Sequence, residues 1–335
     1  MLETTLCGVT LKNPVIAASG TFGFGAEYSE FFDVSRLGGI CTKGLTLHPR
    51  EGNSGLRVWE TPAGMMNSVG LQNPGIPVFL ERELPRMRTL GTAIIANVGG
   101  GDLEEYIEGV RLLSNTDGVD IIELNISCPN VREGGMAFGI KCDVAASVVA
   151  AVRPVCAKPL MVKLSPNAED ITAMAIACEQ AGADAVSLVN TFKALAIDIH
   201  TRKAVFDNVT AGLSGPCIKP IALRMVWEVA SAVHIPVVGI GGIATWQDAL
   251  EFIMAGATAV QVGTATFVKP TTMLDIVDGL ERYCTDEHLT SIATVCNILG
   301  TVPNCNILGT ETPCLEQKGS GGPKTVTLSG GEYDN

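Results

Sequence analysis

The sequence predicts a (β/α)8 barrel built as a single domain. Eight short apolar runs recur along the chain, and amphipathic segments with helical spacing lie between them. The runs are apolar throughout rather than alternating, which is typical of parallel strands buried on both faces. Eight such units in about 250 residues match the count and length of this barrel. An open doubly wound sheet is the alternative, because periodicity alone does not show that a sheet closes.

The predicted strands and helices succeed one another from Val15 to Val262. The expected strands are Val15–Ala18, Gly39–Thr42, Ala93–Asn97, Asp120–Ile126, Leu160–Leu164, Ala185–Val189, Pro236–Ile240 and Ala259–Val262. The expected helices are Leu103–Leu113, Asp143–Val152, Glu169–Ala181, Ile221–Val233 and Trp246–Ala255.

Three further segments add to the plain alternation of strand and helix. Thr4–Leu6 and Val9–Leu11, on either side of Gly8, are expected to form a hairpin that covers the barrel floor. Residues 49–77 form a long, weakly periodic loop rich in glycine and asparagine, and a loop of that length is often functional. Residues 196–208 alternate in polarity and predict a second hairpin. Both insertions are expected at the barrel mouth.

The end of the chain departs from this pattern. No linker interrupts residues 1–295, which we expect to form the single domain. The six residues Cys296–Thr301 recur verbatim as Cys305–Thr310, and after Gln317 the composition turns to Gly, Ser, Thr and Lys. Two copies are too few for a repeat architecture. Residues 296–335 are therefore predicted to be an atypical tail, disordered or added in cloning.

Composition narrows the function classes. Of 335 residues, 47% are hydrophobic and 17% charged, which excludes extensive disorder. Lys plus Arg number 23 and Asp plus Glu 35, so the net charge is −12, which disfavours a role dominated by nucleic-acid phosphates or anionic lipid. The chain shows neither a signal peptide nor an apolar run long enough to span a membrane. Its eleven scattered cysteines include no Cys-x-x-Cys pair, so we expect reduced thiols, no metal and a cytoplasmic enzyme.

Polar residues follow nearly every predicted strand. In a barrel, the carboxyl ends of the strands form the mouth, where binding and chemistry gather. A ring of amides, hydroxyls and two lysines there predicts a large ligand with polar edges. The residues at these ends are Ser19-Gly20, Thr42-Lys43-Gly44, Asn97, Asn125 to Asn130, Lys163-Leu164-Ser165, Asn190-Thr191, Gly239 to Gly242 and Gly263-Thr264.

The glycine turn Gly239–Ala244 allows three interpretations. It fits the Gly-x-Gly-x-x-Ala dinucleotide fingerprint, but the next strand ends in Gly263-Thr264 and supplies no acidic residue for a ribose. Two successive strands that end in glycine fit the phosphate site of barrels better, since bare N–H groups can hold a phosphate there. A role in packing alone is the third interpretation.

Two lysines and one cysteine are candidates for chemistry. Lys43 and Lys163 end apolar strands, where an ammonium group needs an anionic partner or must reach the solvent at the rim. Two such lysines at one mouth favour an anionic cofactor or substrate. Cys128 follows a strand end and precedes Pro129 and a glycine-bearing segment that is typical of a lid. An inert thiol and a catalytic thiolate fit this position equally, because no histidine lies near it in sequence.

From Leu6 to Val268 the sequence resembles the class 1 dihydroorotate dehydrogenases, in particular subclass 1B. Class 2 members carry serine in place of Cys128 and a membrane extension at the N-terminus. The family usually ends in a short amphipathic helix, from which the repeated tail departs. The segments that carry the resemblance are Asn13-Pro14, Ala18 to Gly20, Lys43 to Arg50, Asn67 to Gly75, Asn125 to Val131, Gly134-Gly135, Ala137 to Gly139, Val162 to Asn167, Gly212 to Gly215 and the two glycine turns.

The resemblance implies FMN at the barrel mouth and oxidation of (S)-dihydroorotate to orotate in pyrimidine synthesis. It makes Cys128 the base that removes the C5 proton while hydride passes from C6 to flavin N5. It places Lys163 beside the flavin N1/O2 edge. Residues expected at the FMN phosphate are Gly241, Gly242, Gly263 and Thr264. Further flavin contacts are expected from Ser19, Lys43, Gly44, Asn97, Asn125, Val189 and Gly215. Orotate contacts are expected from Lys43, Asn67, Ser68, Val69, Gly70, Leu71, Asn125, Asn190 and Thr191.

Subclass 1B also implies a partner. Its catalytic chains form a homodimer within a heterotetramer, whose second subunit carries FAD and a [2Fe–2S] cluster and passes electrons to NAD⁺. Subclass 1A behaviour, a homodimer that reduces fumarate, is the first alternative. A flavin barrel that reduces uridine in tRNA is another, although the net charge of −12 argues against it. A non-catalytic barrel that binds phosphate ligands is the last, and it would need neither Cys128 nor the paired lysines.

Overall fold

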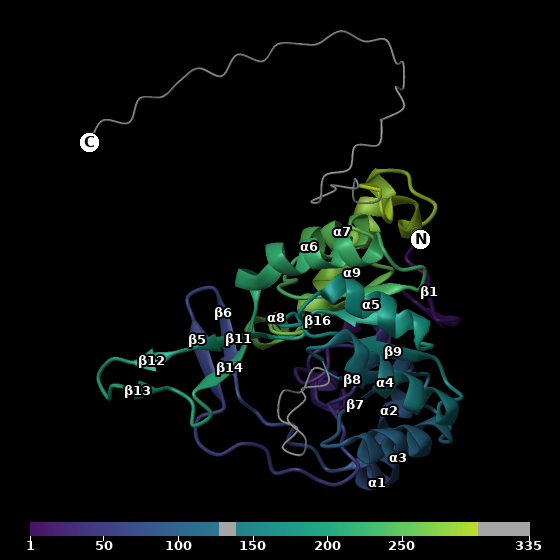
Figure 1. Cartoon of the computed structure of the whole chain (residues 1–335). Helices are drawn as coiled ribbons and strands as arrows, with labels where there is room; N and C mark the ends of the chain where they lie inside the picture. Colours follow the sequence, from purple (N-terminus) through teal and green to yellow (C-terminus); the bar gives the residue numbers. More distant parts are fainter. Residues whose placement is uncertain (127–138, 301–335) are drawn as a thin grey trace, which may run out of the picture. The chain divides into compact units, whose positions relative to one another are not determined.

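The computed structural model describes residues 1–126 and 139–300, which lie within one compact unit, Met1–Val302 (Figure 1). Eight parallel strands close into a barrel in the order β3-β4-β7-β8-β9-β10-β15-β16, which confirms the predicted fold class. Every predicted strand is present within one or two residues. The strands are β3 (Val15–Ala17), β4 (Gly39–Cys41), β7 (Ala93–Val98), β8 (Ile121–Asn125), β9 (Leu160–Lys163), β10 (Ala185–Leu188), β15 (Val237–Ile240) and β16 (Ala259–Val262).

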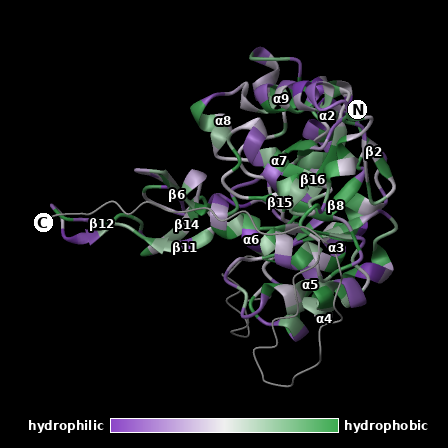
Figure 2. Ribbon diagram, turned by 90° about the horizontal axis from the view of Figure 1, so that it is seen from above, coloured by the Kyte–Doolittle hydropathy of each residue, from purple (hydrophilic) through white to green (hydrophobic). Residues whose placement is uncertain are grey.

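The barrel closes between its last and its first strand. β16 pairs with β3 in the register Val260↔Val15, Gln261↔Ile16 and Val262↔Ala17. The main-chain N–H of Ala18 continues this pairing by donating to the carbonyl of Val262 over 2.9 Å. The strands are apolar at most positions and bury both faces in this barrel, as parallel sheets require. Figure 2 shows β8, β15 and β16 in the colours of apolar residues.

The predicted hairpin seals the barrel floor. β1 (Thr4–Leu6) and β2 (Val9–Leu11) pair antiparallel, and the turn between them places Cys7 and Gly8 at positive φ. Leu6 and Leu11 are buried against a layer of apolar side chains that point into the barrel. The floor layer consists of Ile16, Cys41, Ile95, Ile121, Met161, Ala185, Val238 and Ala259. The lower half of the barrel is therefore a packed apolar core.

The helices cover the outside of the barrel. All five predicted helices are present, and short polar side chains cap three of them. Asp102 and Asp170 accept main-chain N–H groups at the starts of α3 and α5. Thr245 forms a capping box with Asp248 at the start of α7. The helices are α3 (Leu103–Ser114), α4 (Cys142–Val152), α5 (Ile171–Gln180), α6 (Lys219–Ala230), α7 (Trp246–Met254), α8 (Ala265–Val268) and α9 (Thr272–Asp286). Short 3-10 turns lie at Ala26–Glu30, Val34–Arg36, Arg153–Val155, Pro216–Ile218 and Ile292–Val295.

The structure corrects the prediction of a plain loop over residues 49–77. This segment contains β5 (Val58–Thr61) and β6 (Gly64–Asn67), which pair with β14 (Thr210–Ser214) and β11 (Phe192–Leu195) in a four-stranded sheet beside the barrel. The pairing joins residues about 150 positions apart, and a local pattern cannot reveal it. The predicted hairpin at 196–208 is present as β12 (Ile197–Asp198) and β13 (Lys203–Ala204), and it projects beyond this sheet in both views (Figures 1 and 2).

Besides the short helix α8, two longer helical segments were not predicted. One runs from α1 (Ile76–Val78) through a π-helical turn (Phe79–Glu83) and α2 (Leu84–Met87) to a 3-10 turn (Arg88–Leu90). The other is α9. Past it, Ile292 donates its main-chain N–H to the carbonyl of Met1 over 3.0 Å, and Asn297 and Ile298 donate to carbonyls of α7. The first copy of the repeated tail sequence thus begins packed on the barrel, and the second copy lies outside the described residues. The domain boundary at 295 stays a prediction.

Candidate active site

Polar side chains replace the apolar core in the upper half of the barrel. Strand pairing sets Asn97 opposite Glu123 and Asn125 opposite Lys163, and Ser187 lies beside Lys163 on the other neighbour. Because alternate residues of a strand point to the same face, Glu123 and Asn125 of β8 both follow Ile121 into the barrel interior. The structure therefore brings Asn97, Asn125 and Lys163, three residues predicted at the flavin, to one place.

Three amides continue from this cluster across the mouth. The Nδ2 atom of Asn125 lies 3.5 Å from Oδ1 of Asn97, and Nδ2 of Asn190 lies 3.5 Å from Oδ1 of Asn125. The main-chain carbonyl of Asn125 accepts the hydroxyl of Tyr106 over 2.8 Å, which fixes the end of β8. Asn190 also accepts the main-chain N–H of Thr191. This row presents amide donors and acceptors with one orientation, which suits an imide edge.

A buried carboxylate that the sequence analysis missed lies beneath these amides. Glu123 is fully buried, and its Oε1 atom lies 3.6 Å from Nζ of Lys163, which is 5% exposed. Burial by itself would raise the pKa of the Glu123 carboxyl, but the Lys163 ammonium and hydrogen bonds from neighbouring side chains hold it below its ordinary value. The signal was present in the sequence, because Glu123, Ser187 and Gln261 interrupt otherwise apolar strands at inward positions.

The second predicted lysine lies on the other side of the mouth. Lys43 follows β4 and donates its main-chain N–H to the carbonyl of Gly23. Burial, and then the charge of Arg57, lower the pKa of the Lys43 ammonium below its ordinary value. An anionic ligand next to Lys43 would offset both effects. Gly44 lies against both Asn97 and Leu71, since a Cβ on Gly44 would approach each within 3.2 Å.

The predicted orotate segment, Asn67 to Leu71, crosses from the added sheet to this side of the mouth. Asn67 ends β6 and lies opposite Gly212 of β14. Ser68 accepts hydrogen bonds from the amides of Asn53 and Asn208 at 3.0 and 3.2 Å. The segment Val69 to Leu71 then turns sharply, with Gly70 and Leu71 both at positive φ. The added sheet and residues 49–57 therefore hold this segment at the barrel mouth.

The two glycine turns meet at one corner of the mouth. A Cβ on Gly242 would lie 2.9 Å from the carbonyl oxygen of Gly215 and 2.8 Å from the main-chain nitrogen of Lys219, so this turn has no room for a side chain. Gly215, Gly241 and Gly242 all have positive φ. Thr264 donates its hydroxyl to Ser214 over 2.8 Å, which joins the turn after β16 to the turn after β14.

This corner has the donors that a phosphate needs. Within residues 1–126 and 139–300, and outside the strand pairing, no protein acceptor receives the main-chain N–H of Gly242, Gly263 or Thr264. A bare cradle of N–H groups without side chains fits a terminal phosphate. The residues present are thus chemically suited to a ligand that joins a terminal phosphate to a ring with polar edges.

The remaining predicted residues lie at the same mouth, with one exception. Ser19 follows β3, and its main-chain N–H faces the Cys41 thiol. Val189 follows β10, donates its N–H to the carbonyl of Ile240 over 2.8 Å, and lies against Gly241. Cys128 lies outside the described residues, so its role stays a prediction.

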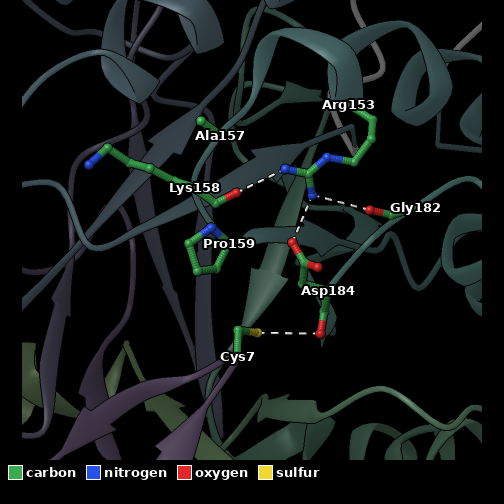
Figure 3. Close-up of a pocket in the computed structure, with 7 residues that line it drawn as sticks. All are labelled: Cys7, Arg153, Ala157, Lys158, Pro159, Gly182 and Asp184. Atoms are coloured by element: carbon green, nitrogen blue, oxygen red, sulfur yellow. Dashed lines mark hydrogen bonds and ion pairs between the residues drawn. The ribbon is translucent and has the colours of Figure 1, made fainter.

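The opposite end of the barrel holds a cavity of about 370 Å³ that shows no comparable chemistry (Figure 3). Its polar lining is satisfied internally. Arg153 donates to the carboxylate of Asp184 over 2.7 Å and to the carbonyls of Gly182 and Lys158. Cys7 donates its thiol to the carbonyl of Asp184, and burial followed by the Asp184 charge raises the pKa of that thiol to about 12. A neutral thiol on the barrel floor is not a nucleophile.

Comparison with known proteins agrees with this geometry. The family model for dihydroorotate dehydrogenase matches residues 1–284. The chain is 59% identical over 301 residues to a Petrotoga mobilis protein named "Dihydroorotate dehydrogenase B (NAD(+)), catalytic subunit", covering 89% of this chain and 100% of that protein. Proteins of the same name from Parabacteroides distasonis and Thermoanaerobacter pseudethanolicus are 53% and 52% identical over 86% and 90% of this chain, and the matches span 94% and 98% of those proteins.

These relatives confirm the resemblance to subclass 1B that the sequence motifs indicated. Across the part of the chain that the structure describes, no helix combines the length and apolar character needed to cross a bilayer. The chain belongs to the dihydroorotate dehydrogenase family, a family of oxidoreductases.

Proposed function

We propose that this chain uses FMN to oxidise (S)-dihydroorotate to orotate in pyrimidine synthesis. The observation that carries the proposal is the juxtaposition at one barrel mouth of a bare N–H cradle, a buried lysine and a row of three amides. Bound FMN supplies a hydride acceptor at its N5 atom. The chain's own residues bind and orient the two ligands and move one proton.

The phosphate is held by the N–H groups of Gly241, Gly242, Gly263 and Thr264. Lys163 provides positive charge at the N1/O2 edge, where negative charge gathers when the ring is reduced. Ser19, Gly44, Val189 and Gly215 line the rest of the flavin site. Asn97 lies under it, since its amide is buried beside Glu123.

The substrate is held between the amide row and the segment Asn67 to Leu71. Asn125 and Asn190 present donors and acceptors to the imide edge, with Thr191 beside them. Lys43 and the main-chain groups of Ser68 to Leu71 receive the carboxylate. Cys128 acts as the base that takes the C5 proton, and the hydride leaves C6 on the opposite face. This pairing of base and hydride acceptor produces the C5–C6 double bond of orotate.

The electrons then leave through a partner. We propose an electron-transfer subunit with FAD and a [2Fe–2S] cluster, which reduces NAD⁺, in a heterotetramer around a homodimer of this chain. The relatives' name, a catalytic subunit of the NAD(+) type, supports a separate partner. The eight cysteines that the structure describes are free thiols, which suits the cytoplasm.

The test of the central proposal is anaerobic mixing of the purified yellow chain with dihydroorotate. The flavin absorbance should bleach in a single turnover, with one orotate formed per flavin. A colourless protein that gains no colour from added FMN would contradict the proposal, and a yellow protein that dihydroorotate does not bleach would contradict the assigned substrate. Bleaching by tRNA dihydrouridine would move the chain to the uridine reductases.

A further inference from the structure

Glu123 carries the most deeply buried charge at the mouth, and every side chain that contacts its carboxylate is a hydrogen-bond donor. The residue is fully buried, with 0% of its surface exposed. Oε1 and Oε2 both have donors within hydrogen-bonding or ion-pair distance, from other strands of the barrel. These are Asn97 Nδ2 at 2.6 Å, Cys41 Sγ at 3.2 Å and Lys163 Nζ at 3.6 Å on Oε1, and Gln261 Nε2 at 2.6 Å and Ser187 Oγ at 3.0 Å on Oε2. This donor set is complementary to an ionised carboxylate.

Barrel closure does not require this charge. The floor layer directly below consists of apolar side chains and Cys41, and it packs without any ion pair. A buried ion pair adds little net stability compared with apolar residues of the same volume. Its position is informative instead, because Lys163 and Asn97, the two residues that Glu123 contacts on neighbouring strands, lie at the upper edge of the barrel interior toward the flavin site.

Glu123 also fixes the direction of the amide row. Asn97 donates its Nδ2 group to Glu123, so its Oδ1 atom must face the other way, toward Nδ2 of Asn125. Asn125 then presents its Oδ1 atom to Nδ2 of Asn190. A carboxylate can only accept hydrogen bonds, whereas an amide in its place could also donate one. Asn97 can therefore turn only its Nδ2 group toward Glu123, and its side-chain amide has a single orientation.

We propose that Glu123 is a positioning residue that holds the Lys163 ammonium against the flavin N1/O2 edge and orients the amide row of Asn97, Asn125 and Asn190. The inference rests on the proposed function, since it assumes FMN at the mouth. Glu123 touches neither ligand and acts through Lys163 and Asn97. The titratable groups that face Glu123 are Cys41 from β4 and Lys163 from β9; Asn97, Ser187 and Gln261 do not titrate. Burial, and then the charge of Glu123, raise the pKa of the Cys41 thiol well above its ordinary value, so it stays neutral.

Sulfite affinity of the bound flavin measures this role without any turnover. Sulfite adds its lone pair to flavin N5, and the displaced electron pair is taken up at N1/O2, so positive charge there strengthens binding. In Glu123→Gln, the Lys163 ammonium loses the buried carboxylate that holds it in place. We expect the sulfite Kd at pH 8 to rise about tenfold relative to the wild type.

A double-mutant cycle identifies the route of the effect. In a Lys163→Met background, Glu123→Gln should change the sulfite Kd less than about twofold, since the lysine through which it acts is gone. Equal losses in both backgrounds, or an unchanged Kd in Glu123→Gln alone, would overturn the proposal. If Glu123→Gln does not fold, Glu123→Asp replaces it. Asp withdraws the charge by one methylene and should give a smaller loss, and a wild-type Kd in Glu123→Asp would overturn the proposal.

The wild type separates this inference from the proposed function. A wild-type chain that binds no FMN refutes the proposed function. A wild-type chain that binds FMN and sulfite, with a Glu123→Gln variant identical to it, refutes only the role of Glu123.

Discussion

At the scale of single residues, the mouth contains groups that the sequence analysis identified and one, Glu123, that it missed. Lys43, Asn125 and Lys163 stand at strand ends, where polar residues stand out, and the structure gathers them at one mouth. Glu123 lies within a strand, and its importance depends on donors from several other strands. The sequence shows Glu123 as a polar residue within an apolar strand, but its partners become evident only when the barrel closes.

Cys128→Ala tests the base. The variant should keep its FMN, because the described flavin contacts lie elsewhere, but flavin reduction by dihydroorotate should slow by about 10²–10⁴-fold, the usual contribution of a positioned base. Stopped-flow absorbance under anaerobic conditions measures the rate. Cys142→Ala at the start of α4 is the matched control and should reduce its flavin at the wild-type rate. A wild-type rate in Cys128→Ala would reassign that thiol to packing.

Glu123 should also make stability depend on pH. Its folded-state pKa lies below the ordinary value of 4.5, so the ionised carboxylate stabilises the folded protein above that pH. The contribution is lost as the pH falls through the folded-state pKa. Urea unfolding at several pH values should therefore show a gap between wild type and Glu123→Gln that narrows below about pH 4.5. Glu60→Gln, an exposed position on β5, is the control, and a gap independent of pH would contradict the prediction.

At the scale of elements, local patterns predicted what local residues determine. All eight barrel strands were found from apolar runs, and five helices from their amphipathic spacing. The helical segment from Ile76 to Leu90 was missed because Pro77 and Pro85 interrupt its pattern, and α9 was missed although Met273, Ile276, Val277 and Leu280 carry helical spacing. Strands β5 and β6 depend on a distant partner, β14, and no local pattern reveals such a pairing.

The turn after β15 requires glycine at position 242, and a substitution there tests the proposed phosphate site. Gly242→Ala places a Cβ against the main chain of Lys219 and the carbonyl of Gly215, so the N–H cradle must shift and FMN affinity should fall at least about tenfold. Gly8→Ala is the control. Gly8 has a similar φ of +81°, against +73° for Gly242, but nothing lies within 4 Å of its added Cβ. Both variants carry backbone strain, and only Gly242→Ala should lose flavin in equilibrium dialysis. Equal FMN affinity in the two would contradict the phosphate site.

At the scale of the whole molecule, nearly all of the described chain builds one barrel with one ligand-binding mouth. The sequence shows no four-cysteine cluster spacing, and its one Rossmann-like turn lacks the acidic residue that holds a ribose. On the function proposed above, these features agree with a separate subunit that passes the electrons to NAD⁺.

Steady-state assays of the chain purified alone test that route. With dihydroorotate and NAD⁺, we expect NADH formation to be slow, and addition of an electron-transfer subunit with FAD and a [2Fe–2S] cluster should raise it by orders of magnitude. Rapid NADH formation without a partner would contradict the heteromeric assembly. Efficient reduction of fumarate by the chain alone would instead assign subclass 1A behaviour. A dye acceptor serves as the control that the flavin is competent.

The pairing of β16 with β3 has a consequence for the order of events during synthesis. Val260 lies opposite Val15 in this pairing, the seam of the barrel, so the hydrogen bonds between β3 and β16 cannot form until a segment some 245 residues further along the chain has been made. Gly263 and Thr264 emerge just after the seam's last strand, and Ser19 just after its first. The phosphate cradle of the proposed function therefore does not exist on a nascent chain, and the proposed FMN could bind only after nearly the whole barrel has left the ribosome. Quenching of FMN fluorescence during refolding would consequently report the last step of folding rather than an early one.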